Sequence, residues 1–354
     1  HLRTLLSSAV VTALAYMPNA YAGTDTWFTP LTESSPVVSE PDNAFEEINA
    51  PWVLAEDGMH FKNLVNMRTI EDEIAGQGQT VVRALNAGSV ASMFDMIAYS
   101  ADGRYLFIPH ETPWSAGVSR YDLWSGKNVV IFEGDGQAIG CPDREVPCEL
   151  WENDYAAFDP ARMTPNGTVF LGEEWSGEGR IMEIMNPFDA TSPEDVDFRE
   201  LESIANVAHE GINFSEKYND TIYYIDEWNS GSIYKFVMST PGDYTSGQTF
   251  VLVVDEYISS GGKPMDNWNE QAEGVVRTGM ATWVPITDEA GNPTTNVNPF
   301  RNGPTNDPRI NDNTRGGRPA ADEVNGTPYG RPEDMEIGRL GNCLLYTSDA
   351  ADDS

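Results

Sequence analysis

One layout occurs three times along this chain, and it constrains the fold more than any other feature. Each copy opens with a turn dipeptide, continues with a strand-length apolar run, and reaches an acidic corner before a glycine-led second strand. Short apolar strands separated by such turns are typical of antiparallel sheets. The copies begin at Asp102-Gly103, Asn166-Gly167 and Asn219-Asp220, and their corners are Pro109-His110-Glu111, Glu173-Glu174-Trp175 and Asp226-Glu227-Trp228.

The spacing of these copies predicts an all-β fold, a β-propeller of about six blades. Gly117, Gly179 and Gly231 open the second strands and stand 62 and 52 residues apart, close to the length of one blade. The 14 Tyr and 14 Phe agree with β-structure. We expect the turn–strand unit to be the innermost strand of each blade. Further strands are predicted over 126–133 and 250–256, one short helix over 68–75, and a long loop over 285–330.

The two ends are expected to lie outside the propeller, which we place at residues 23–342. Residues 1–22 have the features of an export signal, because Arg3 precedes a short apolar run and Ala20-Tyr21-Ala22 offers small residues for cleavage. A retained anchor is the weaker alternative, since the run is short for a bilayer. Residues 343–354 resemble translated sequencing-adapter read-through, a non-native tail, and a genuine polar tail is the alternative. We therefore predict a secreted or periplasmic protein.

Cys141 and Cys148 are separated by six residues. In an exported protein, this pair most simply forms a local disulfide that closes a surface loop. Metal binding is the minor alternative, because two sulfurs without a nearby His or a further Cys do not complete a zinc site.

The acidic corners predict a metal centre. Because neighbouring blades bring equivalent positions together near the axis, the corner carboxylates are expected to converge there. Several ionised carboxylates share a small volume only when cations neutralise them. Hard oxygen donors favour Ca²⁺ first, then Mg²⁺ or Mn²⁺, with Fe³⁺ as a further candidate. The alternative is that these carboxylates only solvate the loop corners. The candidate ligands are Glu111, Glu173, Glu174, Glu210, Asp226 and Glu227.

Four segments stand in one order over roughly residues 93–337: 109–120, 163–174, 208–237 and 330–336. Together they resemble the PhoX-type alkaline phosphatases, which are secreted calcium- and iron-dependent β-propellers. The resemblance implies that Glu173 or Glu174, Glu210 and Glu333 are metal ligands and that Arg331 holds a phosphate oxygen. An arginine suits that role, since its guanidinium binds phosphate bidentately.

One departure from that family concerns iron. The family has a cysteine ligand for Fe³⁺ shortly before its Thr-Pro motif, whereas residues 155–164 here contain no Cys and offer only Asp159 as an oxygen donor. The departure argues for Ca²⁺ and against the iron centre, and with it against full phosphatase activity.

Three functions follow as hypotheses. The first is a metal-dependent phosphatase for a small phosphorylated substrate, in which His110 or His209 assists proton transfer. The second is a calcium-stabilised propeller that binds a partner without catalysis, and the third is a calcium-dependent lactonase or esterase. The net charge of −35 argues against nucleic-acid partners. We expect a monomer that does not associate with a membrane after cleavage of the signal.

Overall fold

A computed structural model describes residues 64–65, 67–76, 94–141, 149–175, 179–228, 230–264, 274–300, 316–340 and 343–348. The chain divides into two units, His1–Leu64 and Val65–Ser354, and the description below concerns the second. The predicted export signal lies outside the described residues. Cys141 is disulfide-bonded, and its predicted partner Cys148 also lies outside them.

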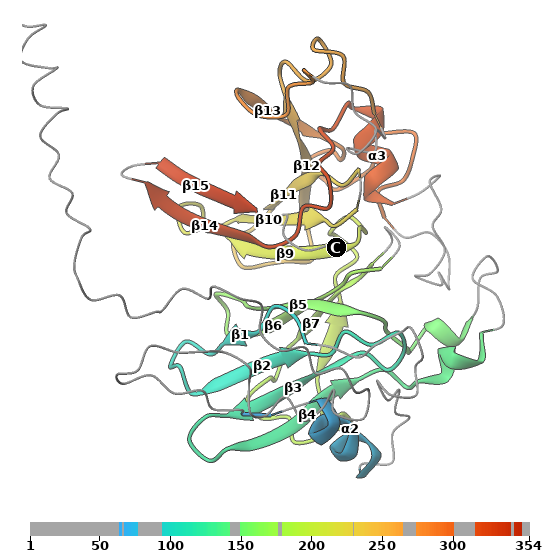
Figure 1. Cartoon of the computed structure of the whole chain (residues 1–354), viewed down its shortest axis with the longest axis vertical. Helices are drawn as coiled ribbons and strands as arrows, with labels where there is room; N and C mark the ends of the chain where they lie inside the picture. The colour runs from blue at the N-terminus through green and yellow to red at the C-terminus, as the bar shows by residue number, and fades with distance from the viewer. Residues whose placement is uncertain are drawn as a thin grey trace, which may run out of the picture. The chain divides into compact units, whose positions relative to one another are not determined.

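Three antiparallel sheets make up most of this unit, and in each of them consecutive strands pair as a meander (Figure 1). The first sheet contains β1 (Ala98–Tyr99), β2 (Tyr105–Pro109), β3 (Gly117–Asp122) and β4 (Lys127–Glu133). The second contains β5 (Phe158–Met163), β6 (Val169–Glu173), β7 (Ile181–Ile184) and β8 (Phe198–Glu200). The third contains β9 (His209–Phe214), β10 (Thr221–Asp226), β11 (Ile233–Met238), β12 (Gly247–Val254) and β13 (Ala281–Pro285).

The first strands of the three sheets are neighbours in space. Strand β5 lies between β1 and β9, and the backbone N–H of Ala161 in β5 donates to the carbonyl of Met96, 3.0 Å away. A further strand, β14 (Met335–Leu340), lies against the other side of β9 and pairs with β15 (Cys343–Ser348) (Figure 1). The residues predicted as a tail from 343 onward thus include a paired strand.

Alternation along the second strands places the core between the sheets. In β6, Leu171 packs toward the first sheet and Phe170 toward the third. In β10, Tyr224 faces the second sheet, whereas Tyr223 and Ile225 pack with Met335 of β14. Because both faces of these strands are covered, their sequences are continuous apolar runs rather than alternating ones.

Two expectations about the strands and loops are corrected. The repeated apolar strand corresponds to β2, β6 and β10, which are second in their sheets and not innermost. The segment predicted as a loop over 285–330 contains a short helix, α3 (Gly317–Glu323). Its glycine and proline hide it from sequence patterns, although proline is tolerated in the first turn of a helix.

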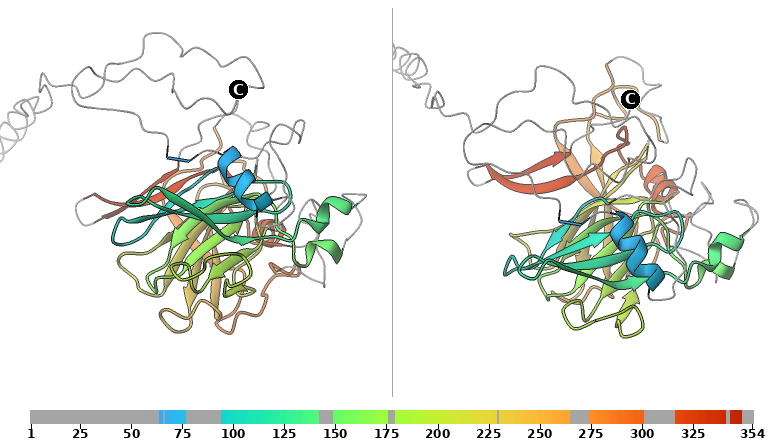
Figure 2. Two further views of the ribbon diagram at one scale, coloured as in Figure 1. Left: turned by 90° about the horizontal axis from the view of Figure 1, so that it is seen from below. Right: turned by 60° about the horizontal axis from the view of Figure 1, so that its bottom comes forward.

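The predicted helix is confirmed as α2 (Met67–Gly76), which lies beside β4 (Figure 2). Its Glu73 accepts hydrogen bonds from the backbone N–H of Val130 and from the side-chain amide of Asn128, at 2.9 and 2.8 Å. None of the helices in the described ranges is long and apolar enough to cross a bilayer. Short 3-10 turns, η4 (Gln137–Gly140) and η5 (Glu149–Trp151), flank the disulfide loop.

Candidate metal centre

The corners of the three repeats are equivalent in structure. At each corner, one backbone N–H closes the loop onto the strand that follows: that of His110 donates to the carbonyl of Gly117, that of Glu173 to Arg180 and that of Asp226 to Ser232. The next residue also has a fixed backbone partner in two of the corners. Glu174 donates to the carbonyl of Ala157 and Glu227 to that of Ala208, each at 2.8 Å and each just before a first strand.

The first acid of the second corner is used by the protein itself. Glu173 is fully buried, and both of its carboxylate oxygens accept hydrogen bonds from the buried Arg180 guanidinium, at 2.6 and 2.7 Å. Backbone N–H groups of Ala156 and Arg180 complete its shell at 3.0 Å. The predicted role of Glu173 as a metal ligand is therefore corrected to that of an internal ion-pair partner.

The first acid of the third corner behaves in the same way. Asp226 is fully buried and accepts hydrogen bonds from Arg318 of α3, at 2.7 Å from Nε to Oδ2 and 2.6 Å from Nη2 to Oδ1. The backbone N–H of Ala208 donates to the same Oδ1 at 3.1 Å. Because the Arg318 guanidinium already neutralises Asp226, we also remove Asp226 from the predicted metal ligands.

The second acids of the corners converge instead. Burial raises the pKa of Glu174, and the charges of Glu227, Asp159 and Glu111 raise it further. Burial likewise raises the pKa of Glu111 to about 7, with added repulsion from Asp95 and Glu227. These mutual charge effects show that the three corner carboxylates, which follow strands of three different sheets, are neighbours in space.

Two of the first strands add acids at matched β-bulges. In the second sheet, Asp159 and Pro160 of β5 lie opposite the single residue Gly172, between the pairs Phe158–Glu173 and Ala161–Leu171. In the third sheet, Glu210 and Gly211 of β9 likewise lie opposite the single residue Ile225 of β10. A bulge redirects the side chain of the extra residue. Asp159 and Glu210 therefore hold equivalent positions in neighbouring sheets.

Acids next to β1 and β14 complete the group. A carboxylate oxygen from each of Asp95, Glu111 and Asp159 lies within 4.8 Å of the others, and the same holds for Asp95, Glu210 and Asp334. Asp95 precedes β1 and Asp334 precedes β14, so every first strand contributes an acid near its start. We call the set Asp95, Glu111, Asp159, Glu174, Glu210, Glu227 and Asp334 the acidic ring.

Two members of the acidic ring are buried with oxygens that have no partner. Asp159 and Glu210 are 4% and 5% exposed, and Oδ1 of Asp159 and Oε2 of Glu210 accept no hydrogen bond from an N–H or hydroxyl donor. The two carboxyls lie close enough to share a proton with each other. Burial raises the pKa of both carboxyls, and the charges of neighbouring acids, Asp95 beside Asp159 and Asp159 beside Glu210, raise them further. Buried ionised carboxylates without partners are costly, so this arrangement favours either bound protons or a bound cation.

Arg331 lies at the rim of the acidic ring, with its side chain 39% exposed. Its Nε donates to Oε1 of Glu227, and its Nη2 lies 3.8 Å from Oε1 of Glu333. The Arg331 backbone has a φ of 45°, in the left-handed region, and its N–H donates to the carbonyl of Trp228 at 2.9 Å. The structure thus places Arg331 beside Glu227 and Glu333, all three of which the sequence analysis names as candidate site residues.

The two histidines proposed for proton transfer are buried. Burial lowers the pKa of His110 and of His209 to about 3, so both rings are neutral at physiological pH. The Nε2 of His110 lies 2.8 Å from the Ser119 hydroxyl, and the His209 ring packs beside Tyr224 with centroids 5.4 Å apart. His209 precedes Glu210 in a strand, where successive side chains point to opposite faces. These environments fit structural roles.

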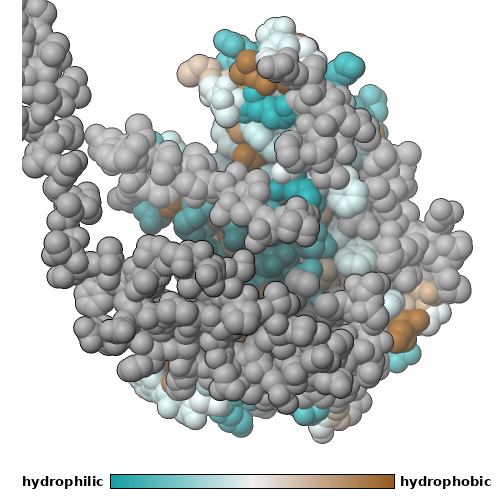
Figure 3. Space-filling model, in the orientation of Figure 1, coloured by the Kyte–Doolittle hydropathy of each residue, from teal (hydrophilic) through white to brown (hydrophobic). Residues whose placement is uncertain are grey.

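The donor set of the acidic ring consists of carboxylate oxygens, which suit a hard cation such as Ca²⁺. It does not fit iron held by a thiolate, since no cysteine is among its members. On the face of the molecule that Figure 3 shows, hydrophilic residues lie in the central recess.

Comparisons with known proteins identify no family for this chain. No family model matches the chain, and no curated protein matches it. Among solved structures, the chain is similar to "Pseudomonas fluorescens PhoX in complex with vanadate, a transition state analogue", with a TM-score of 0.40 and 12% identity over 68% of this chain. The chain spans only 56% of that structure's length. A likeness of this size does not place the chain in a family.

Sequence reasoning missed Asp95 and Asp334 as members of the acidic ring. Strand β1 has only two residues, so no apolar run marks the segment that follows Asp95. A usable signal was nevertheless present, because Phe94-Asp95 before β1 matches Phe158-Asp159 in β5.

Proposed function

We propose that this protein is a metal-dependent hydrolase of phosphate monoesters whose metal centre is the acidic ring. One observation carries the proposal: the unpartnered, buried oxygens of Asp159 and Glu210 sit at matched bulges of neighbouring sheets among further acids. Bulges at equivalent positions are structural features rather than accidents, and they concentrate near active sites.

The electrostatics favour cations over bound protons at neutral pH. Protons can neutralise some of these carboxyls, but a proton shared between two oxygens leaves the other lone pairs of a buried carboxylate unsatisfied. A divalent cation with six to eight oxygen ligands uses them together. Asp95 belongs to both groups of close oxygens, so we place it between two cation positions.

The residues divide between holding the metal and orienting the substrate. Asp95, Asp159 and Glu210 would hold the cation together with Glu111 and Asp334, and a bound divalent cation supplies Lewis-acid stabilisation of developing charge on phosphate oxygens. Arg331, partly exposed at the rim, would clamp the phosphoryl group bidentately, as guanidinium groups do. Glu227 keeps the Arg331 guanidinium turned toward the ring through their hydrogen bond.

Other parts of the proposal concern fold and location. The three sheets with adjacent first strands, followed by β14 in the same relation to β9, support a propeller-like arrangement in which β14 begins the next blade. Export to the periplasm or the medium remains our proposal from residues 1–22, and a monomeric state remains a proposal as well.

The test is hydrolysis of an aryl phosphate by the purified protein after EDTA treatment and after addition of Ca²⁺. We expect activity to disappear with EDTA, to return with Ca²⁺, and to be lost in Asp159→Asn. The matched control is Glu336→Gln, because Glu336 is an exposed acid two residues past the ring with a 3.4 Å ion pair to Arg162 and a hydrogen bond from the backbone N–H of Ile337.

The alternatives give different results in the same assay. Stabilisation by Ca²⁺ without turnover of any ester would show a non-catalytic calcium-binding protein. Turnover of an aryl lactone that survives Arg331→Gln, with no phosphate hydrolysis, would show a lactonase. No response to Ca²⁺ in either stability or activity contradicts the metal centre itself.

A further inference from the structure

Arg331, at the rim of the acidic ring, has a backbone conformation that its own sequence disfavours. Its φ of 45° lies in the left-handed region, where residues other than glycine are uncommon. The next residue is Pro332, and a residue before proline favours extended backbone. Such a conformation persists only where surrounding contacts impose it, and it occurs most often at active sites and ligand clamps. The contacts that hold Arg331 therefore matter for its proposed role.

Residues 327–331, which we call the strap, lead up to this position along the third sheet. Thr327 is fully buried, and its hydroxyl accepts a hydrogen bond from the backbone N–H of Val254 at 2.8 Å. Arg331 is partly exposed, so the strap is fixed at its start and needs support nearer its end. Every second backbone N–H of the strap donates to a carbonyl of the third sheet or its corner: Thr327 to Leu252 at 3.0 Å, Tyr329 to Gly231 at 2.7 Å and Arg331 to Trp228 at 2.9 Å.

Arg277, which precedes β13, supplies support just before Arg331. Its Nε donates to the carbonyl of Pro328 at 2.7 Å, and the Tyr329 hydroxyl donates to the carbonyl of Arg277 at 3.2 Å. Burial raises the pKa of Tyr329 to about 12, so this hydroxyl keeps the proton that it donates. The Arg277 guanidinium also lies over the Tyr257 ring, 5.4 Å from its centroid. Arg277 and the strap thus hold each other by two hydrogen bonds of opposite direction.

We propose that Arg277 is a positioning residue for the phosphate clamp: it holds the strap, and the strap holds Arg331 at the rim of the acidic ring. The inference rests on the proposed function, in which Arg331 binds the phosphoryl group. A guanidinium binds phosphate through two parallel N–H groups, so a small displacement of its backbone weakens the contact. Glu227 aligns the Arg331 side chain, whereas Arg277 acts on its backbone through Pro328.

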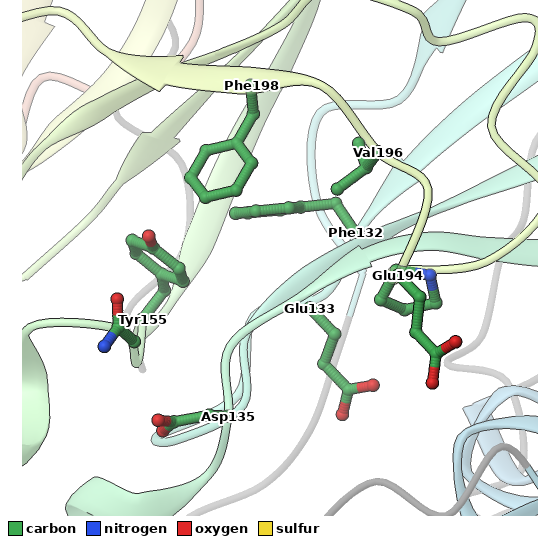
Figure 4. A pocket seen from close by; sticks show the side chains of 9 residues that line it. Phe132, Glu133, Asp135, Tyr155, Glu194, Val196 and Phe198 are labelled. Atoms are coloured by element: carbon green, nitrogen blue, oxygen red, sulfur yellow. The ribbon is translucent and has the colours of Figure 1, made fainter.

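Two cavities that share no residue with the acidic ring bear on the test, because phosphate bound there would mask an effect at Arg331. One, of about 250 Å³, has only acids among the charged residues of its lining, namely Glu133, Asp135 and Glu194 (Figure 4). It offers no positive charge to a phosphate. The other, of about 180 Å³, is lined by Arg120 and Lys127 and could attract one.

Arg120 also provides the matched control for Arg277. Its Nη1 donates to the carbonyl of Pro187 at 2.7 Å, and its guanidinium lies 5.5 Å from the centroid of the Tyr105 ring. Arg120→Gln therefore removes the same kind of contact as Arg277→Gln, an arginine that binds a proline carbonyl beside a tyrosine. It also removes a positive charge from the second cavity.

The first measurement is amide hydrogen exchange of peptides spanning the strap, in the Ca²⁺-saturated full chain. Arg277→Gln should speed exchange at Tyr329 and Arg331 about tenfold, because a charged hydrogen bond to the strap is lost. Arg277→Lys keeps a charged donor and should retain most of the protection, and Arg120→Gln should retain all of it. If Arg277→Gln does not fold, Tyr329→Phe should show a smaller increase. Wild-type exchange in the variant that folds overturns the proposal, whether or not the protein is a phosphatase.

The second measurement is kcat/KM for para-nitrophenyl phosphate. Arg277→Gln should lower it about tenfold, Arg277→Lys should restore most of the loss, and Arg120→Gln should leave it unchanged. Added to Arg331→Gln, Arg277→Gln should cause no further loss, since a residue that acts through Arg331 has nothing left to position. Equal losses with and without Arg331 would show a purely structural role and overturn the proposal. A wild type without phosphatase activity refutes the proposed hydrolase instead, and the exchange rates still decide whether Arg277 holds the strap.

Discussion

Arg318 and Asp226 form a buried, two-point ion pair across 92 residues of chain, with donor–acceptor distances of 2.6 and 2.7 Å. The guanidinium also lies over the Trp228 ring, 4.8 Å from its centroid. This pair fastens α3 to the third corner, next to Glu227 of the acidic ring. A helix that the sequence hides is therefore part of what positions the candidate metal centre.

Replacing Arg318 should destabilise the fold strongly. Arg318→Met leaves Asp226 buried without its counter-charge, which costs about 3–5 kcal/mol of unfolding free energy. Arg104→Met is the matched control, because it breaks an equally short pair with Asp122 that is exposed to solvent, and it should cost much less. Equilibrium denaturation measures both, and equal losses would contradict the assignment of Asp226 to a buried ion pair.

Removing a buried acid from the ring should have opposite effects with and without metal. In metal-free protein, Asp159→Asn removes a carboxyl whose pKa burial has raised, so thermal unfolding should move to a higher temperature. With Ca²⁺ at about a hundred times its dissociation constant, wild type gains about 2.7 kcal/mol. The variant should lose most of that gain, while Glu336→Gln keeps it. A full Ca²⁺ response in Asp159→Asn would remove Asp159 from the ligands.

Arg331 should matter for phosphate and not for metal. Arg331→Gln is expected to lower kcat/KM for an aryl phosphate by about 10- to 100-fold, since a charged bidentate contact is lost. Arg331→Lys keeps the positive charge but not the bidentate guanidinium, and its kcat/KM should lie between those of wild type and Arg331→Gln. The Ca²⁺-dependent rise in melting temperature serves as the control and should persist in both variants. An unchanged kcat/KM would show that Arg331 only neutralises Glu227.

The pH dependence of stability should report on Glu133. Its pKa is raised in the folded state to about 9, above its ordinary value near 4.5, so the folded protein holds a proton that the unfolded chain releases. Stability from this group is present below pH 4.5 and is lost as the pH rises toward 9. Glu133→Gln should therefore gain stability relative to wild type over that range, by up to a few kcal/mol. Denaturation at pH 5, 7 and 9 checks this, and a constant difference would contradict it.

The repeat predicted the strands well because both faces of β6 and β10 are covered, which gives continuous apolar runs. At the corners, it predicted two adjacent acids as metal ligands where only the second belongs to the acidic ring. Of two adjacent acids, the first is held by a buried arginine, whereas the second lies in the ring, where Glu227 contacts the partly exposed Arg331. Local sequence does not distinguish Asp226 from Glu227 in this respect. The distinction depends on Arg318, which only the fold brings near. The bulges that redirect Asp159 and Glu210 are likewise properties of strand pairing.

The contact between β9 and β14 has a consequence for how the molecule is made. Gly211 permits it, because a Cβ there would lie 2.5 Å from the backbone nitrogen of Met335. The acids from the three sheets occur between residues 95 and 227, whereas Asp334 follows more than a hundred residues later. When the chain folds from its N-terminal side, most of the acidic groups come together early, and the last of them arrives with β14. Ion capture during folding would therefore begin at an open centre and end with the docking of this late strand.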